Sequence, residues 1–423
     1  MNKSAVSWAL YDWGNSAFAT TVMAGFFPLF FKQYWSAGSD VTASTFQLGL
    51  ANSAASLLII FIAPALGAIA DQGGTRKGFL YAFTALGVGM TGGLYFVAQG
   101  DWLLASLLYV GASIGFFASL IFYDALLIAV TTPARYDRVS ALGFALGYLG
   151  GGLLFAVNVT MTLKPHWFGL ADAASAVRIS FLTVALWWAL FTLPLAWWVP
   201  EPAGTGRSGL AAVTGGFRQL RDTFREVRRL RHIGLFLLAY WCYIDAVDTI
   251  IRMAVDYGLA IGLAAESLIT ALLITQFVGF PAAIAFGRLG ERFGPKISIY
   301  VAIGVYCLVV LWAARMESEA EFYLLAVVIG LVQGGIQSLS RSLYARLIPA
   351  DKSAEFFGFF NMLGKFAAVV GPILVGWVSL ASGNPRLSLL SLLALFALGA
   401  WFLSRVDVSR GIHVAQGTEQ PPA

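Results

Sequence analysis

The stretch that decides the fold is GAIADQGGTRK at residues 67–77, because a related stretch, GRLGERFGPK, follows at residues 287–296. Each copy has a glycine, an acid, a second glycine and a basic residue at equal spacing, namely Gly67, Asp71, Gly74 and Arg76, and Gly287, Glu291, Gly294 and Lys296. Lys77 adds a second basic residue to the first copy. A polar loop that recurs between apolar segments in each half of a chain is typical of transporters built by duplication.

The composition predicts an all-α membrane protein. Of the 423 residues, 59% are hydrophobic and only 12% are charged, whereas soluble domains carry roughly 25% charged residues. A transmembrane helix needs about 20 mostly apolar residues. We expect twelve transmembrane helices, one from each of the apolar segments 5–33, 46–70, 79–99, 102–130, 139–162, 177–199, 233–256, 265–287, 297–314, 321–346, 357–381 and 386–404.

A polar stretch at residues 200–232 separates the first six segments from the last six. It predicts an N-terminal six-helix bundle at 1–199, a C-terminal six-helix bundle at 233–404 and a tail at 405–423. Inside the linker, arginines surround a stripe of apolar residues spaced by three and four, at Phe217, Leu220, Phe224, Val227 and Leu230. This pattern indicates a basic amphipathic helix on the membrane surface, and a solvated linker is the alternative.

The lysines and arginines predict the topology. With the amino terminus in the cytoplasm, basic residues favour the cytoplasmic side by roughly four to one, as the positive-inside rule requires. We therefore expect a multi-pass protein of the inner (plasma) membrane, with both termini and both copies of the loop in the cytoplasm. The net charge of +5 then reflects topology, and we expect no nucleic-acid partner.

The sequence has no pattern that predicts catalysis or metal binding. None of its three histidines has metal-ligand spacing, and it has no phosphate-binding P-loop or zinc-protease motif. Gly111, Ser113 and Gly115 have the spacing of a hydrolase nucleophile elbow, but that motif needs a strand–turn–helix context. We expect no enzyme, no metal and no cofactor.

Further landmarks of the repeat follow in order along the two halves. DWGNS at residues 12–16 resembles DAVDT at residues 245–249. Pro64 corresponds to Pro281, and Pro133 to Pro349. These landmarks favour a duplication of the whole six-segment unit.

The motifs resemble those of a known family. The loop of residues 67–77 resembles the signature of the major facilitator superfamily, and the second copy strengthens the likeness. YDWGNSAFAT at 11–20, GIQSLSRSLYARLIP at 335–349, AEFFGF at 354–359 and GKFAA at 364–368 are similar to a branch related to the fungal vacuolar amino-acid effluxers. The resemblance implies the major facilitator fold, secondary transport, and a central cavity lined by segments one, four, seven and ten.

Four acids inside apolar segments are candidates for proton coupling. An ionisable group inside a membrane costs about 2.5–3.5 kcal/mol on insertion scales, so it is a functional candidate by default. Burial also favours the protonated form of a carboxyl group. The candidates are Asp12, Asp124, Asp245 and Asp248, and the alternative is that they neutralise nearby bases. Protons are the expected coupling ion, with sodium left open.

Polar residues on the same segments are candidates for substrate binding. Gln333, Gln337 and Arg341 recur at four-residue spacing on segment ten, and arginine binds carboxylates in bidentate fashion. Arg252 lies four residues from Asp248 and can form an ion pair with it. The full set of candidates is Tyr11, Asn15, Tyr123, Arg252, Gln333, Gln337, Arg341, Asn361 and Lys365.

The repeated loop predicts a cytoplasmic latch that breaks and reforms during transport. A carboxylate near the start of a helix is stabilised by the exposed backbone donors there, and glycine permits the sharp turn. The alternative is a simple turn that also sets the topology. The residues assigned to the latch are Gly67, Asp71, Gly74, Arg76, Lys77, Gly287, Glu291, Gly294 and Lys296.

Together these features predict a monomeric secondary transporter in the lipid bilayer. Its expected substrate is a small polar or zwitterionic solute, such as an amino acid, and family likeness favours export. Broad-specificity efflux of amphipathic compounds is one alternative. A membrane sensor or scaffold that transports nothing is the other.

Overall fold

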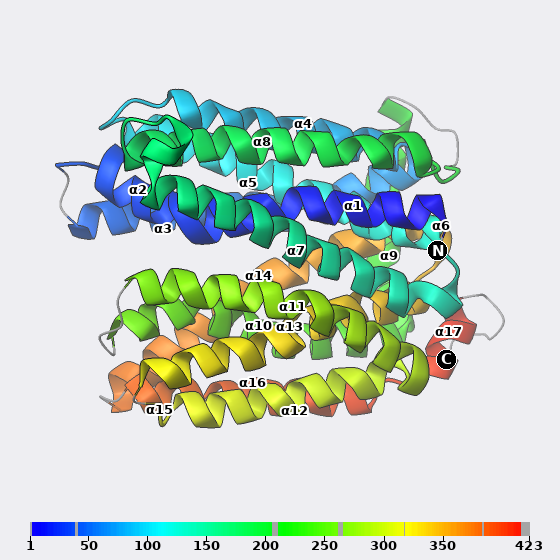
Figure 1. Ribbon diagram of the computed structural model, residues 1–423. Coiled ribbons are helices and arrows are strands. Elements are labelled where there is room, and N and C mark those ends of the chain that lie inside the picture. Colours follow the sequence, from blue (N-terminus) through cyan, green and yellow to red (C-terminus); the bar gives the residue numbers. More distant parts are fainter. Residues whose placement is uncertain are drawn as a thin grey trace.

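The computed structural model describes residues 2–38, 41–204, 210–260, 265–316, 318–382 and 385–415, and all secondary structure in these ranges is helical (Figure 1). The N-terminal half contains α1 (Lys3–Ala17), η1 (Phe18–Phe26), α2 (Phe27–Phe30), η2 (Phe31–Trp35), α3 (Val41–Gly73), α4 (Arg76–Gly93), η3 (Leu94–Phe96), α5 (Trp102–Ala125), α6 (Leu127–Val130), η4 (Pro133–Arg135), α7 (Tyr136–Leu163), η5 (Pro165–Phe168) and α8 (Ala173–Trp198).

The linker helix α9 (Leu210–Arg229) follows. The C-terminal half contains α10 (Arg231–Ala260), α11 (Ala265–Phe293), α12 (Pro295–Ala313), α13 (Glu319–Leu347), η6 (Ala350–Lys352), α14 (Ser353–Ser382), α15 (Pro385–Leu390), α16 (Leu392–Ser404) and α17 (Val408–Ala415). The tail predicted at 405–423 therefore includes a short helix.

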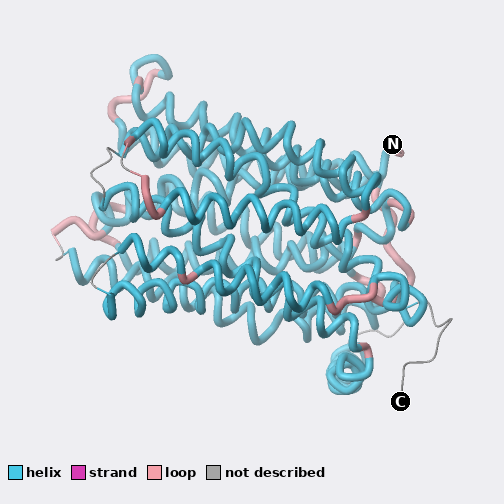
Figure 2. Tube along the Cα trace, turned by 90° about the horizontal axis from the view of Figure 1, so that it is seen from below, coloured by secondary structure: helices cyan, strands magenta, loops and turns pink. Residues whose placement is uncertain are grey.

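The helices form twelve long rods in two sets of six, as the hydropathy predicts. Nine helices of the described chain are long and apolar enough to cross a membrane, and Ser388–Ser404 with Val408–Ala415 forms a further pair bent by 62°. The other two rods are the run from α1 to η2 and helix α14. Figures 1 and 2 show the rods running side by side along the molecule.

Each half is a bundle, and the most extensive contacts between the halves come from two pairs of helices. In the N-terminal half α1 packs on α7 and α8, and in the C-terminal half α10 packs on α14 and α16. Between the halves, α3 packs against α14 and α7 against α11. These two pairs occupy corresponding places in the two halves, as duplication predicts. We call the end where α1 begins and α17 lies the terminus end (Figure 1).

The first rod is not a regular α-helix. Over Phe18–Phe26 it widens into a π-helix, and the N–H of Phe27 donates to the carbonyl of Val22, five residues back. Pro28 follows and has no backbone N–H to continue the ladder. Such single π-segments are frequent at functional sites, and this one borders the central cavity through Ala19 and Thr20.

The linker helix α9 packs on the protein with a face other than the apolar stripe of the predicted amphipathic helix. Its buried residues Ala212, Gly216 and Thr223 are small, and α9 packs against α3. A Cβ atom on Gly216 would lie 2.8 Å from a side-chain carbon of Ile69. Phe217, which belongs to the predicted apolar stripe, remains 57% exposed. The small residues therefore contact α3, and Phe217 points away from this interface.

Candidate functional site: a charged cluster between the two halves

A cavity of about 340 Å³ lies between the two halves. Helices α1, α5 and α7 line it from one half, and α10, α11, α13 and α14 line it from the other. Most of the candidates from the sequence are in its wall, namely Asp12, Asn15, Asp124, Asp248, Gln333, Gln337, Arg341, Asn361 and Lys365. The helices predicted to line the cavity do so, and α7, α11 and α14 add to them.

Arg341 is at the centre of a buried polar cluster. Its guanidinium belongs to α13 of the C-terminal half, yet all its recorded hydrogen bonds go to the N-terminal half. Nη1 donates to Oδ1 of Asp124 at 3.0 Å and lies 3.8 Å from Oδ2 of Asp12. Nε donates to Oγ of Ser140 at 2.8 Å, and Nη2 donates to the Ser140 carbonyl at 2.9 Å. Arg341 is only 3% exposed, so the cluster joins the halves inside the protein.

Aromatic rings enclose this guanidinium. Its central carbon lies 4.5 Å from the ring centre of Phe144 and 4.8 Å from that of Trp8. A cation over an aromatic face is attracted by the negative charge above the ring. Arg341 donates three hydrogen bonds to the protein and also lines the cavity, and its binding of the head group of a solute stays a prediction.

Tyr123 positions Asp12. Its hydroxyl donates to Oδ2 of Asp12 at 3.0 Å, and its ring stacks on Trp8 with the ring centres 4.4 Å apart. The Trp8 indole N–H in turn donates to the Tyr123 carbonyl at 2.7 Å. Tyr123 is fully buried and is not in the cavity wall, so it contacts Asp12 and not the cavity itself.

Helix α14 supplies a second link to the acids. Nδ2 of Asn361 donates to Oδ2 of Asp124 at 3.1 Å, while Arg341 holds the other oxygen of that carboxylate. One turn further on, Nζ of Lys365 lies 3.3 Å from the ring centre of Phe117 on α5. Both residues of α14 thus contact the opposite half across the cavity.

Three amides complete the polar wall. Gln333 and Gln337 are half-buried on α13 and line the cavity. Asn15 is 1% exposed, and its Nδ2 has no hydrogen-bond partner among the described residues. A buried donor without a partner is costly, so Asn15 is suited to bind a polar group that enters the cavity.

Three further candidates from the sequence are not among the described residues that line the cavity. Tyr11 shares a hydrogen bond of 2.8 Å with Thr84 and packs inside the N-terminal bundle. Asp245 accepts the backbone N–H of Gly371 at 2.9 Å and is 1% exposed. Neither lines the cavity, and the roles predicted for them stay predictions. The side chain of Arg252 lies outside the described residues.

Helix α7 belongs to the site, although no predicted site residue lies on it. Ser140, Phe144 and Tyr148 come from this helix, and Tyr148 forms part of the cavity wall. The available signal is a run of glycines that allows α7 to approach α1. A Cβ atom on Gly147 would lie 2.6 Å from Oγ of Ser16, and one on Gly150 would lie 2.5 Å from the Trp13 carbonyl.

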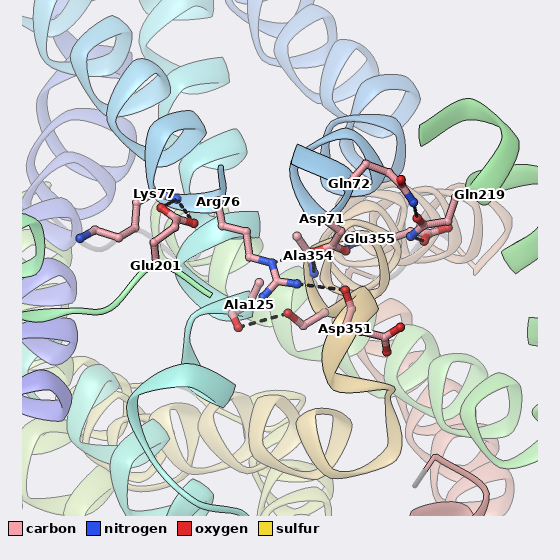
Figure 3. A network of polar contacts seen from close by, with 11 residues as sticks. Asp71, Gln72, Arg76, Lys77, Ala125, Glu201, Gln219, Asp351, Ala354 and Glu355 are labelled. Atoms are coloured by element: carbon pink, nitrogen blue, oxygen red, sulfur yellow. Dashed lines mark hydrogen bonds and ion pairs between the residues drawn. The ribbon is translucent and has the colours of Figure 1, made fainter. Parts of the chain in front are cut away.

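The first copy of the repeated loop joins the two halves at the terminus end. The Asp71 carboxylate accepts the backbone N–H groups of Ala354 and Glu355 at 3.2 and 2.8 Å, at the start of α14 (Figure 3). Arg76 donates to Asp71 at 2.6 Å and to the carbonyl of Asp351 at 3.0 Å. A Cβ atom on Gly67 would collide with the Ala354 carbonyl. Glycine therefore allows α3 and α14 to touch, and Asp71 caps the helix that it meets.

The linker also takes part in this contact. Gln219 of α9 accepts a hydrogen bond from Gln72 of α3 and donates one to the carboxylate of Glu355 on α14 (Figure 3). Glu355 is fully buried. One linker side chain is therefore bonded to both halves beside Asp71.

The second copy of the loop does not repeat this chemistry. Glu291 is exposed and forms no ion pair within the described ranges, although it aligns with Asp71. The corresponding contact uses Asp137 of α7, which receives two hydrogen bonds from Arg346 at 2.7 and 2.9 Å. Gly287 and Gly290 pack against α7 around Ala141 and Asp137. The terminus end is thus held by two different ion-paired contacts.

The turns in the two copies of the repeated loop have the same backbone conformation at glycine and a similar lysine contact. Gly74 and Gly294 have φ of +62° and +84°, a region that favours glycine. Nζ of Lys77 donates to the carbonyl of Val199 at 2.7 Å, just past the end of α8. Nζ of Lys296 donates to the carbonyl of Val406 at 2.7 Å, just past the end of α16. The spacing of the two sequences aligns Lys296 with Arg76, but the contacts of Lys296 correspond to those of Lys77.

Comparison with known proteins agrees with this architecture. The chain matches the model of the family described as "Vacuole effluxer Atg22 like" over residues 37–132 and 129–416. It is 38% identical to the MFS-type transporter YxiO of Bacillus subtilis (strain 168), over 99% of this chain and 98% of that protein. It is 26% identical to autophagy-related protein 22 of Yarrowia lipolytica, over 67% of this chain and 52% of that protein. The match therefore spans about half of this fungal relative.

Solved structures share the fold at low sequence identity. The proton:xylose symporter XylE has a TM-score of 0.71 at 14% identity, covering 96% of this chain and 94% of its own. The human organic anion transporter MFSD10 has a TM-score of 0.71 at 16% identity, covering 95% of this chain and 99% of its own. At these identities the likeness establishes the fold alone.

Proposed function

The chain belongs to the Atg22-like family of vacuole effluxers and is a transporter of the major facilitator type, and we propose that it moves a small polar or zwitterionic solute by alternating access, driven by protons. The observation that carries this proposal is the cavity between the halves, whose wall contains carboxylates, cations and amides together. A solute with one positive and one negative group finds an opposite charge for each there. Amino acids are the simplest such solutes.

The head group of the solute is assigned to residues beside the Arg341 cluster. We assign its carboxylate to Lys365, because an ammonium binds carboxylates as a point charge. We assign its ammonium group to Asp248, which lines the cavity from α10. The Nδ2 donor of Asn15 and the amide of Gln337 supply hydrogen bonds. Nδ2 of Asn15 has no hydrogen-bond partner among the described residues, and a polar group of the solute would supply one.

Proton coupling is assigned to the Arg341 cluster. Two carboxylates, Asp12 and Asp124, share one guanidinium, so one of them can take up a proton while the other still neutralises Arg341. A buried charge that loses its partner is strongly destabilising. Protonation of Asp124 therefore weakens the link between the halves at the cavity, and we propose that this lets the halves separate. At the terminus end the Asp71 contact must then also break.

The direction and the topology are part of the proposal. The family is named for effluxers, which favours export. The excess of basic residues at the loops of the terminus end favours the cytoplasm for that end. We place the protein in the plasma membrane as a monomer with both termini inside.

The test is flux in proteoliposomes of the full-length protein. Radiolabelled alanine, leucine and glutamate are offered under a pH gradient alone and under a sodium gradient alone. We expect accumulation of at least one zwitterion with the pH gradient, no accumulation with sodium, and loss of uptake in Lys365→Gln. Lys164→Gln is the matched control, because Lys164 is exposed just past the end of α7 and lies outside the cavity wall. Binding measured by thermal shift without any flux would instead indicate a sensor.

A further inference from the structure

A second cavity opens beside the first. It has a volume of about 270 Å³ and lies between the C-terminal half and η1 of the N-terminal half, toward the end opposite the terminus end. Most of its wall comes from α11, α12 and α13, and η1, α10, α15 and α16 complete it. The wall is almost entirely apolar, with Leu268, Met316, Phe322 and Leu325 among its side chains. We call it the apolar chamber.

The apolar chamber and the central cavity share part of their walls. Ala19, Thr20, Gln276 and Gln333 line both. Two of these four residues carry amides, so a polar collar lies where the cavities meet. Beyond the collar the chamber contains no charged residue among the described side chains that line it.

The volume of the apolar chamber sets the size of the group that it can hold. An apolar cavity of about 150 Å³ stays dry and is large enough to bind benzene. At about 270 Å³ the apolar chamber can hold a larger apolar group, and its buried walls at Leu325 and Ala326 offer no partners for water.

We propose that the apolar chamber binds the apolar tail of the transported solute while its zwitterionic head group lies in the central cavity. The substrate class is then an amphipathic zwitterion whose tail is longer than an ordinary amino-acid side chain. The inference rests on the proposed function, which supplies the head-group site. Because the two cavities share part of their walls, one molecule can span both. A lipid acyl chain has no polar group that could bind the amides of the collar or the charged residues of the central cavity.

The experiment compares solutes with one head group and tails of increasing length. Alanine, norleucine, 2-aminooctanoate and 2-aminodecanoate compete for binding and counterflow in proteoliposomes of the full-length protein. Each buried methylene contributes about 0.8 kcal/mol, so affinity rises about fourfold per methylene until the chamber is full. Octylamine and octanoate have the tail without the zwitterion, and we expect them to bind far more weakly than 2-aminooctanoate.

Variants of the chamber test its role directly. Ala271 and Ala326 are buried in its wall, so Ala271→Phe and Ala326→Phe fill it. We expect each to lower the ratio of the affinities for 2-aminooctanoate and alanine by about fifteenfold, which corresponds to the burial of roughly two methylenes. Leu325→Ala enlarges the chamber, so we expect the tail length that binds most tightly to increase. A misfolded variant would not show such a gain. Gly304→Phe is the control, because a Cβ atom at this exposed position of α12 meets nothing within 4 Å.

The outcomes separate this inference from the function on which it rests. Alanine and norleucine transported equally well, with no gain along the series, would overturn the tail site and leave zwitterion transport intact. No binding or flux for any member would overturn both. Octylamine or octanoate binding as tightly as 2-aminooctanoate would overturn the shared site and indicate an independent lipid or detergent site.

Discussion

Arg341 of the C-terminal half donates a hydrogen bond to Asp124 of the N-terminal half, with 3.0 Å between Nη1 and Oδ1. The two residues are 3% and 6% exposed and lie 217 positions apart in the sequence. The pair is therefore a link between the bundles in a region that water hardly reaches. Any movement that separates the bundles at the cavity has to break it.

Asp124→Asn is expected to destabilise the protein and to abolish proton-driven flux. Removing one partner of a buried ion pair typically costs 3–5 kcal/mol, because the other charge remains buried. Thermal unfolding in detergent measures this loss. The double variant Asp124→Asn with Arg341→Gln should recover part of the stability but none of the flux. Strictly additive losses in this double-mutant cycle would show that the two residues do not interact.

Asp12→Asn is expected to abolish accumulation of the solute but to leave exchange of the solute across the membrane intact. If the Asp12–Asp124 pair takes up the coupling proton, the variant still exchanges solute across the membrane in counterflow but no longer concentrates it under a pH gradient. Asp245→Asn is the matched control, because Asp245 is a buried acid on a cavity helix that lies outside the cavity wall, and an amide oxygen can also accept the backbone N–H of Gly371. Loss of accumulation in Asp245→Asn with normal stability would contradict this assignment.

The sequence predicts the rods and most of the cavity wall, because both depend on hydropathy and on helical periodicity. It does not predict which acid faces inward when several share a helix. Asp245 and Asp248 are three residues apart, yet only Asp248 lines the cavity, and Tyr11 faces away from it beside Asp12. It also cannot give partners that are distant along the chain, such as Asp71 with the start of α14.

Asp71→Asn is expected to open the terminus end. A charge at a helix N-terminus contributes about 0.3–2 kcal/mol. Its loss should therefore increase the equilibrium constant for separation of the two halves at the terminus end by up to roughly thirtyfold. Spin labels at Thr75 and Ser404, both exposed at this end, report the distance between the halves in a background without Cys242 and Cys307. Glu291→Gln, at the aligned but exposed position, should leave the distances unchanged. An equal shift in both variants would indicate that the contact with α14 has no special role.

Gln219→Ala tests whether the linker helix is part of the same contact. Gln219 bonds to both Gln72 and the buried Glu355, and a buried group that loses its partner costs about 1–3 kcal/mol. Thermal unfolding should show a loss of this size, and the spin-label distances should shift in the same direction as for Asp71→Asn. Arg218→Ala, at the adjacent exposed position of α9, should change stability by less than about 0.5 kcal/mol. If Gln219→Ala lowers stability but leaves the distances unchanged, the linker helix strengthens the fold without taking part in the opening of the terminus end.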